Sequence, residues 1–117
     1  MSQFIDLPQA LDMTSLYRAE RENILALAYK GNDILPVSET FDRDGVDNVL
    51  AQTDCVKVRI YYGMDEELKV HAIIVGVNSE DEDILPSASL TNGGGTGILE
   101  NAQRCPDDCP PGSALYP

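Results

Sequence analysis

Residues 55–78, with the sequence CVKVRIYYGMDEELKVHAIIVGVN, constrain the fold more than any other part of this chain. Apolar and polar side chains alternate along both halves of the segment, which is the period of a β-strand with one buried face. Glycine and acidic residues at positions 63–67 separate the two halves and indicate a turn. The segment therefore predicts an antiparallel β-hairpin.

The register of this hairpin decides which side chains are buried. If paired residues have numbers that sum to about 130, the apolar residues of both strands fall on one face. These are the even-numbered residues from Val56 to Ile74. We expect this face to be the core of the protein, covered by helices.

Two other segments predict helices. Residues 6–31 are typical of one long helix, because Pro8 suits a first turn and Gly31 suits a helix end. One stripe of this helix is apolar and is expected to face the core; it consists of Met13, Leu16, Tyr17, Ile24, Leu27 and Ala28. Residues 41–52 predict a shorter second helix. Its inner side carries Val46, Val49 and Leu50.

The expected fold class is α+β: a small antiparallel sheet centred on the hairpin, with two helices packed on one face. A two-stranded sheet is marginally stable alone, so residues 33–37, residues 83–85 or a second copy of the chain should add strands. Beyond residue 85 the chain is rich in glycine and proline. We therefore expect an α+β domain over residues 1–85 and a flexible C-terminal segment over residues 86–117.

The charge of the chain limits its partners. Twenty acidic and eight basic residues give a formal net charge of −12. This charge repels nucleic acid and anionic membranes, so neither is an expected partner. Seven acidic residues but only one basic residue, Arg104, follow Lys69, and this polarity favours contact between the two parts within one chain or between copies. The first residues lack a signal-peptide pattern, so the expected location is the cytoplasm.

The outer face of the predicted hairpin is the first candidate site. In the predicted register Arg59 lies opposite His71, and Tyr61 lies opposite Lys69. An imidazole beside a guanidinium and a phenol can hold an anion or transfer a proton. The candidate ligand-binding residues are Arg59, Tyr61, His71 and Arg18. No nucleophile lies beside them, so no catalytic residue is assigned, and a solvated sheet face is the alternative.

Cys105 and Cys109, in the segment RCPDDCPPGS, are the second candidate site. Their spacing suits zinc, but a structural zinc site needs four ligands. Cys55 and His71 cannot complete the set in the predicted register, although a second copy would supply two more thiolates. A redox role is disfavoured because acidic residues between the thiols disfavour the thiolate. The remaining alternative is an exposed tail with two ordinary thiols, reduced in the cytoplasm.

The segments TSLYR, LAQTDC, RIYYGMDEELK, IIVGVN, DIL and RCPDDCPP, in this order, resemble a family of short bacterial proteins of unassigned activity. The resemblance extends from Thr14 to Pro111. It implies that the whole chain, including the cysteine tail, is one unit. It implies no activity and no catalytic or binding residue.

The sequence favours a small acidic protein that acts by contact. We expect a non-catalytic protein-interaction module that self-associates as a homodimer or larger homo-oligomer and presents its acidic surface to a protein partner. No cofactor is expected. Two alternatives stay open: a small-anion-binding sensor or enzyme that uses the hairpin face, and a metal or redox clip formed by Cys105 and Cys109.

Overall fold

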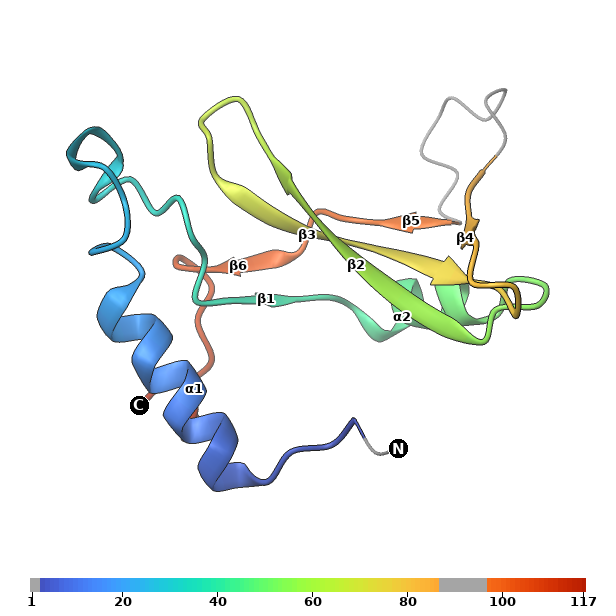
Figure 1. The fold of residues 1–117 in the computed structure, drawn as a ribbon, viewed down its shortest axis with the longest axis horizontal. Helices are drawn as coiled ribbons and strands as arrows, with labels where there is room; N and C mark the ends of the chain where they lie inside the picture. Colours follow the sequence, from blue (N-terminus) through green and yellow to red (C-terminus); the bar gives the residue numbers. More distant parts are fainter. Residues whose placement is uncertain (1–2, 87–96) are drawn as a thin grey trace. The chain divides into compact units, whose positions relative to one another are not determined.

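The computed structural model describes residues 3–86 and 97–117, in which short helices accompany antiparallel strands (Figure 1). This arrangement confirms the predicted α+β class. In chain order the elements are α1 (Leu7–Glu20), the 3-10 helix η1 (Leu27–Tyr29), β1 (Ser38–Thr40), α2 (Arg43–Leu50), β2 (Lys57–Met64), β3 (Val70–Val77), β4 (Asp83–Ile84), β5 (Ile98–Leu99) and β6 (Gln103–Cys105). No helix in these two ranges has the length and apolar character needed to cross a membrane.

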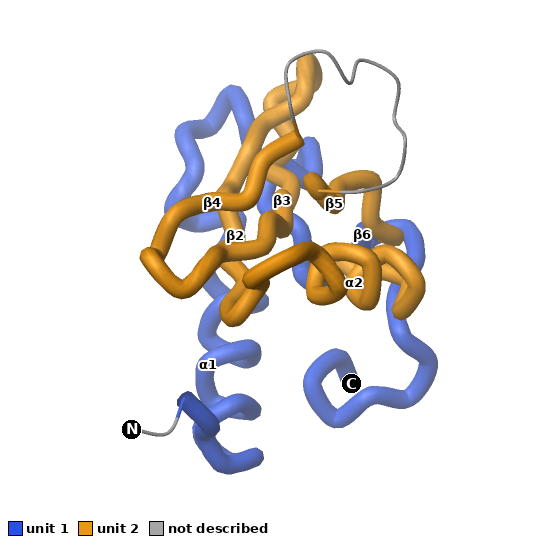
Figure 2. The backbone as a smooth tube through the Cα atoms, turned by 90° about the vertical axis from the view of Figure 1, so that its right-hand side faces the viewer, with its two compact units in different colours: residues 1–38, 104–117 blue, residues 39–103 orange. Residues whose placement is uncertain are grey.

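The chain divides into two compact units (Figure 2). Unit 1 consists of residues 1–38 and 104–117, and unit 2 consists of residues 39–103. The division falls within β1 and β6, which pair with each other in a two-stranded sheet. The predicted boundary between residues 85 and 86 stays a prediction, and residues 87–96 of the predicted C-terminal segment lie outside the described residues.

Unit 2 contains a four-stranded antiparallel sheet with β3 in the middle (Figure 1). β2 pairs with one edge of β3, and the shorter strands β4 and β5 pair with its other edge. The strand predicted at residues 83–85 is thus confirmed as β4. β2 is an edge strand, because no other strand of the described residues pairs with its outer side.

α2 packs on the sheet face that carries even-numbered residues, which confirms the predicted second helix. Its Val49 is buried, and the Val49 carbonyl oxygen lies only 3.4 Å from where a Cβ would stand at Gly76 of β3. Leu99 of β5 contacts the helix at Gly45. Leu50, which was predicted to face inward, is exposed.

The hairpin is confirmed, but the predicted register is wrong. Arg59 lies opposite Val75, and His71 lies opposite Gly63, so Arg59 and His71 are not opposite each other. Compared with the predicted pairing, each residue of β2 lies opposite a residue of β3 that is an even number of positions further along the chain. An even displacement keeps even-numbered residues on one face, so the two sets of side chains were assigned correctly while their partners were not.

The register differs because the turn lies later in the chain than predicted. Gly63 was taken as a turn residue, but it lies within β2. Asp65 closes the turn instead: its N–H donates to the carbonyl oxygen of Lys69 at 3.0 Å, and its carboxylate accepts the N–H groups of Glu67 and Lys69. Leu68 has the left-handed φ of 66° that this tight connection requires.

The predicted core is present only in part, where α2 covers the even-numbered face of β3 at Gly76. The most buried sheet residues, Val75 and Val77, are 2% and 1% exposed and lie on the odd-numbered face of β3. On the even-numbered face of β2, Val58 and Ile60 are about half exposed. The reason is the size of α2, which has eight residues and packs on β3 and β5 while leaving this part of β2 open.

In unit 1, α1 is shorter than the predicted helix over residues 6–31. It begins after Asp6, as predicted, but it ends at Glu20. The carboxylate of Glu22 then accepts the N–H of Gly31 at 2.6 Å, which holds the following segment in a loop containing η1 instead of a continued helix. Gly31 has a left-handed φ of 80°, but it does not end the long helix as predicted, because α1 ends at Glu20.

The apolar stripe of α1 is mostly exposed, contrary to the prediction that it faces a core. Met13 and Leu16 on α1 are exposed, and so is Ile24, which was predicted to continue the stripe but lies beyond the end of the helix. Tyr17 is the exception: its hydroxyl donates to the carbonyl oxygen of Pro36 at 2.6 Å, and burial raises the pKa of its phenol. The stripe therefore contributes one hydrogen-bonded contact to unit 1, that of Tyr17, and does not form a packed layer.

The strand predicted at residues 33–37 is absent at that position. Ile34 is buried within this segment, but the strand β1 begins only at Ser38. Just before β1, the N–H of Val37 donates to the carbonyl oxygen of Cys105 at 2.8 Å. The hydrogen-bonded partner of this region is thus the cysteine segment, which lies far away in the sequence.

Candidate functional site

A group of charged and polar side chains crosses the odd-numbered face of the sheet in unit 2. We call it the Arg59 cluster; it consists of Lys57, Arg59, Tyr61, Asp81 and Asp83. Arg59 donates to Asp83 at 2.5 Å and to Asp81 at 3.1 Å, and Lys57 lies 2.8 Å from Asp81. The Tyr61 hydroxyl also donates to Asp83.

The Arg59 cluster explains the burial of the middle strand. Arg59 and Tyr61 lie on β2 and Asp83 lies on β4, so these hydrogen bonds must pass over β3. Val75 lies opposite Arg59, and Val77 lies opposite Asp83. The aliphatic stem of the arginine and the phenol ring therefore cover these valines, as long polar side chains commonly cover apolar surface.

Electrostatics within the Arg59 cluster are balanced. The hydrogen bonds that Arg59 and Tyr61 donate to Asp83 raise the pKa of both donor groups, while the hydrogen bond from Lys57 lowers the pKa of Asp81. At neutral pH two cations thus face two carboxylates, with a neutral phenol beside them. Such a cluster stabilises the sheet but has no excess positive charge with which to attract an anion.

His71 belongs to a second, acidic group, the His71 cluster, with Asp65, Glu39 and Glu100. Its Nε2 lies 2.7 Å from Asp65, and its Nδ1 lies 3.9 Å from both Glu39 and Glu100. The hydrogen bond with His71 lowers the pKa of Asp65. Three carboxylates around one imidazole disfavour an anion at this position.

Glu39 ties the His71 cluster to the edge of β3. One oxygen of its buried carboxylate accepts the N–H of Ala72 at 2.9 Å, and the other oxygen has no hydrogen-bond partner among the residues that the structure describes. The first contact satisfies a backbone donor beyond the end of β5 and protects this stretch of strand edge. Residues 3–86 and 97–117 contain no group of three histidine, cysteine or acidic side chains arranged to hold a metal ion.

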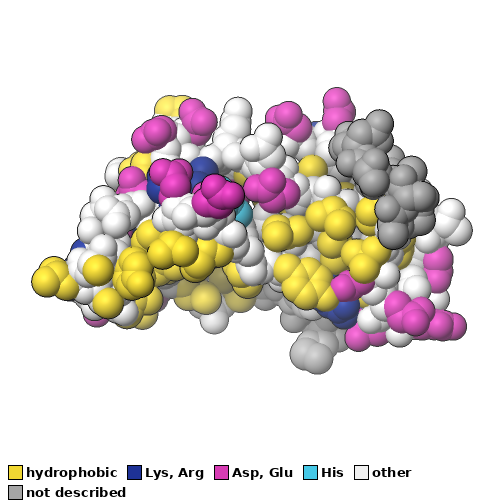
Figure 3. Space-filling model, turned by 90° about the horizontal axis from the view of Figure 1, so that it is seen from above, with side chains coloured by type: hydrophobic (Ala, Val, Ile, Leu, Met, Phe, Trp, Pro, Cys, Tyr) yellow, Lys and Arg dark blue, Asp and Glu magenta, His cyan; other side chains and the backbone are white. Residues whose placement is uncertain are grey.

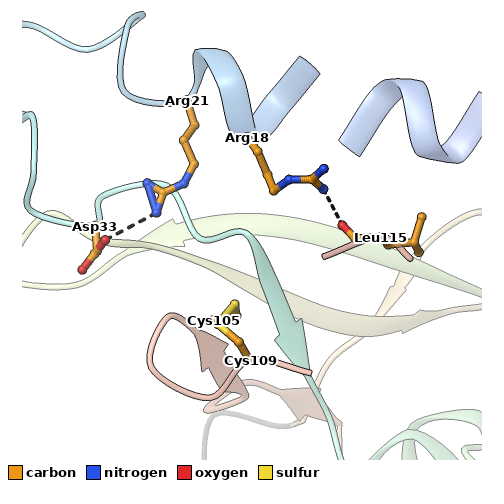
Figure 4. The surroundings of a disulfide bond; sticks show 6 residues. All are labelled: Arg18, Arg21, Asp33, Cys105, Cys109 and Leu115. Atoms are coloured by element: carbon orange, nitrogen blue, oxygen red, sulfur yellow. Dashed lines mark hydrogen bonds and ion pairs between the residues drawn. A yellow bond between two sulfur atoms is a disulfide. The ribbon is translucent and has the colours of Figure 1, made fainter. Parts of the chain in front are cut away.

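The four predicted ligand-binding residues are therefore divided among three places. Arg59 and Tyr61 converge on Asp83, and His71 joins the carboxylates of its own cluster. Arg18, on α1 of unit 1, donates to the carbonyl oxygen of Leu115 at 2.5 Å (Figure 4). A ligand-binding role for these residues stays a prediction, and the register that was to bring Arg59 and His71 together is not present.

Cys105 and Cys109 form a disulfide bond in unit 1 (Figure 4). Cys105 is fully buried at the end of β6, and the neighbouring Arg104 donates to the carbonyl oxygens of Asp33 and Ile34. The expectation of two reduced thiols, whether free or available to a metal, is therefore wrong in this structure. Cys55 carries the free thiol.

The feature that sequence reasoning missed is an apolar stripe on the even-numbered face of β2. We call it the edge stripe; its residues Val58, Ile60, Tyr62 and Met64 are 46%, 50%, 77% and 59% exposed. Figure 3 shows groups of hydrophobic side chains on one face of the surface. The alternation in the sequence identified these residues as a set, but it could not show that the helix leaves them uncovered.

A small hollow lies beside the start of α2 in unit 2. It has a volume of about 210 Å³, and its lining includes Asp42, Asp44 and Glu100 together with Phe41 and Leu99. Its acidic lining disfavours an anion, as in the His71 cluster.

Comparison of the chain with protein-family models, with curated proteins and with solved structures finds no match in any of the three. The function must therefore be inferred from the geometry of the chain itself.

Proposed function

We propose that this chain is a non-catalytic protein-interaction module that self-associates through the outer edge of β2. The observation that carries the proposal is the edge stripe, an exposed row of apolar side chains on an edge strand of eight residues. Unpaired backbone groups along such an edge recruit another strand, and exposed apolar side chains strengthen the contact. Soluble proteins commonly protect long apolar edges with lysine, proline or a bulge, and the edge stripe has none of these on its face.

A second copy of the chain is the partner that the order of side chains along β2 favours. The strand begins with basic residues, Lys57 and Arg59, and it leads into an acidic turn at residues 65–67. If two copies of β2 pair antiparallel, Lys57, which also pairs with Asp81 of its own chain, lies beside the acidic turn of the other copy. The same arrangement is self-complementary, as a two-fold symmetric interface requires.

The proposal is tested by the mass of the protein in solution. We expect light scattering and sedimentation to give the mass of a dimer for the wild type, with a concentration-dependent monomer fraction on dilution. Ile60→Lys should weaken the dimer by about tenfold or more, because it places a charge in an apolar contact next to a strand edge. The melting temperature of the monomer should change little, since Ile60 is half exposed.

Leu16→Lys is the matched control, because Leu16 is also an exposed apolar residue but lies on α1 of unit 1. This variant should keep the wild-type mass. A wild type that stays monomeric up to the highest soluble concentration would overturn the proposal, and so would a dimer that Leu16→Lys dissociates and Ile60→Lys does not.

The anion-binding alternative has less support from the geometry. Its basic residues already pair with carboxylates or with a backbone carbonyl, and its histidine lies among acidic side chains.

A further inference from the structure

We infer that two copies of β2 pair antiparallel in the register centred on Tyr61, so that the two four-stranded sheets join into one continuous sheet. This inference rests on the proposed self-association and adds to it the identity of each contacting residue pair. It follows from three properties of β2, which are the parity of its faces, the order of its side chains and the direction in which its long polar side chains point.

Parity excludes half of the conceivable registers. Residues directly opposite each other in a sheet share a face, so the edge stripe of one copy meets that of the other only when even-numbered residues pair with even-numbered ones. In a register displaced by one residue, Ile60 and Tyr62 would lie opposite odd-numbered, partly charged positions. The apolar rows would then lie on opposite faces of the joined sheet and gain nothing from each other.

Side-chain order selects among the remaining registers. In the Tyr61-centred register, Val58 lies opposite the partner's Met64 and Ile60 lies opposite the partner's Tyr62, so every member of the edge stripe has an apolar partner. A register centred on Tyr62 instead places Val58 opposite the partner's Glu66, which would put a carboxylate in the apolar row.

Charge distinguishes the Tyr61-centred register from one centred on Ile60, which also pairs apolar residues. With Tyr61 at the centre, Lys57 lies opposite the partner's Asp65, and the two-fold axis repeats this pair. With Ile60 at the centre, Lys57 lies opposite the partner's Gly63 and the opposite charges are out of register. The Tyr61-centred register is thus the one that satisfies both the apolar row and the charges.

The other face of β2 leaves room for the partner strand. Arg59 and Tyr61 both direct their polar ends across β3 to Asp83, away from the outer edge of β2. Arg59 and Tyr61 therefore keep Asp83 as their partner when the second strand pairs, and only Lys57 is shared between Asp81 of its own chain and the partner's Asp65. The ion pairs that cover Val75 and the pairing of a second copy at the edge of β2 can therefore exist at the same time.

Disulfide trapping between single-cysteine variants reads this register directly. Ile60→Cys and Tyr62→Cys are made in a Cys55→Ala background, one of them with a mass tag, and the native disulfide is left oxidised. In the inferred register the two new cysteines lie opposite each other across the interface, with their Cα atoms about 5.5 Å apart, within the range of a disulfide. Two cysteines at position 60, or two at position 62, are diagonal neighbours about 7–8 Å apart, which is too far.

The expected result is a heterodisulfide between the two variants that forms at least tenfold faster than either homodisulfide, measured by intact mass after mild oxidation. Dominant crosslinking of Ile60→Cys with itself, or of Tyr62→Cys with itself, would assign a different centre and overturn the inference. Equal crosslinking of both variants with themselves would indicate parallel strands and also overturn it.

Light scattering on the same samples separates the two proposals. If the uncrosslinked variants have the mass of a dimer that Ile60→Lys dissociates, but no heterodisulfide forms, the register is wrong while the proposed function stands. If the samples are monomeric and Ile60→Lys changes nothing, the proposed self-association itself fails. Far-UV circular dichroism of each variant confirms that the hairpin is retained.

Discussion

At the scale of single residues, glycines decide how closely the elements of unit 2 approach. A Cβ at Gly76 would lie 2.9 Å from Sγ of Cys55, 3.0 Å from the buried Oε1 of Gln52 and 3.4 Å from the carbonyl oxygen of Val49. Gly63 differs, because a Cβ there would meet only the end of the Ile73 side chain at 2.8 Å. At Gly76, backbone and buried atoms leave no room for a Cβ, whereas at Gly63 rotation of the Ile73 side chain can make room for one.

Gly76→Ala should therefore lower the free energy of unfolding by about 1–3 kcal/mol, because the added methyl group forces α2 away from β3. Gly63→Ala is the matched control and should cost clearly less, since Ile73 can change rotamer. Urea unfolding monitored by circular dichroism measures both. Equal destabilisation by the two substitutions would contradict the close packing of α2 at Gly76.

At the scale of elements, the turn between β2 and β3 determines the register of the hairpin. Asp65 accepts hydrogen bonds from two backbone N–H groups of the turn, and it also pairs with His71. These contacts lower the pKa of Asp65, with the His71 hydrogen bond as the largest cause and the N–H of Lys69 next. The ionised form of this carboxylate is the one that stabilises the turn.

A carboxyl group with a lowered pKa in the folded state stabilises the protein fully above its unfolded pKa of about 4, and this contribution is lost as the pH falls through the folded value. We expect wild-type stability to decrease as the pH is lowered below about 4. Asp65→Asn should be less stable at pH ~7 and should lose less stability over the same acidic range. Urea midpoints at several pH values measure both effects.

Asp108→Asn, which removes an exposed carboxylate of unit 1, serves as the control and should keep the wild-type dependence on pH. If Asp65→Asn and the wild type lose the same stability between these pH values, the turn does not depend on an ionised Asp65.

At the scale of the whole molecule, each unit is stabilised in its own way. Unit 2 is organised around β3, which is covered by α2 on one face and by the Arg59 cluster on the other. Unit 1 joins the two ends of the chain through the Cys105 carbonyl contact with Val37, the contacts of Arg104 and the hydrogen bond from Arg18 to Leu115. The disulfide between Cys105 and Cys109 closes a small loop within unit 1.

Removal of the disulfide by the double substitution Cys105→Ala and Cys109→Ala should lower the free energy of unfolding by about 2 kcal/mol, the chain-entropy value for a loop of this size. Cys55→Ala should have a much smaller effect. Denaturant unfolding of both variants under non-reducing conditions provides the measurement. Alkylation of the denatured wild type before reduction should modify one thiol, that of Cys55; modification of all three would show that the disulfide is absent.

Local periodicity predicted much of the fold. The alternation over residues 55–78 identified both strands of the hairpin and the sets of residues that share a face, and the apolar spacing over residues 41–52 identified α2. These features depend on backbone geometry that repeats every few residues, which neighbouring residues determine. The candidate site was less predictable, because it depended on which residue of β3 lies opposite Arg59.

The sequence by itself determined where the two hairpin strands, α2 and the start of α1 lie, since side-chain period and capping are local properties. Only the tertiary structure decided the register, the buried face of β3, the exposure of the edge stripe and the pairing of Cys105 with Cys109. An even displacement between strands leaves the alternation unchanged, and whether a face is dry depends on the length of the helix above it. Both are set by contacts between residues far apart in the chain, and no local pattern records them.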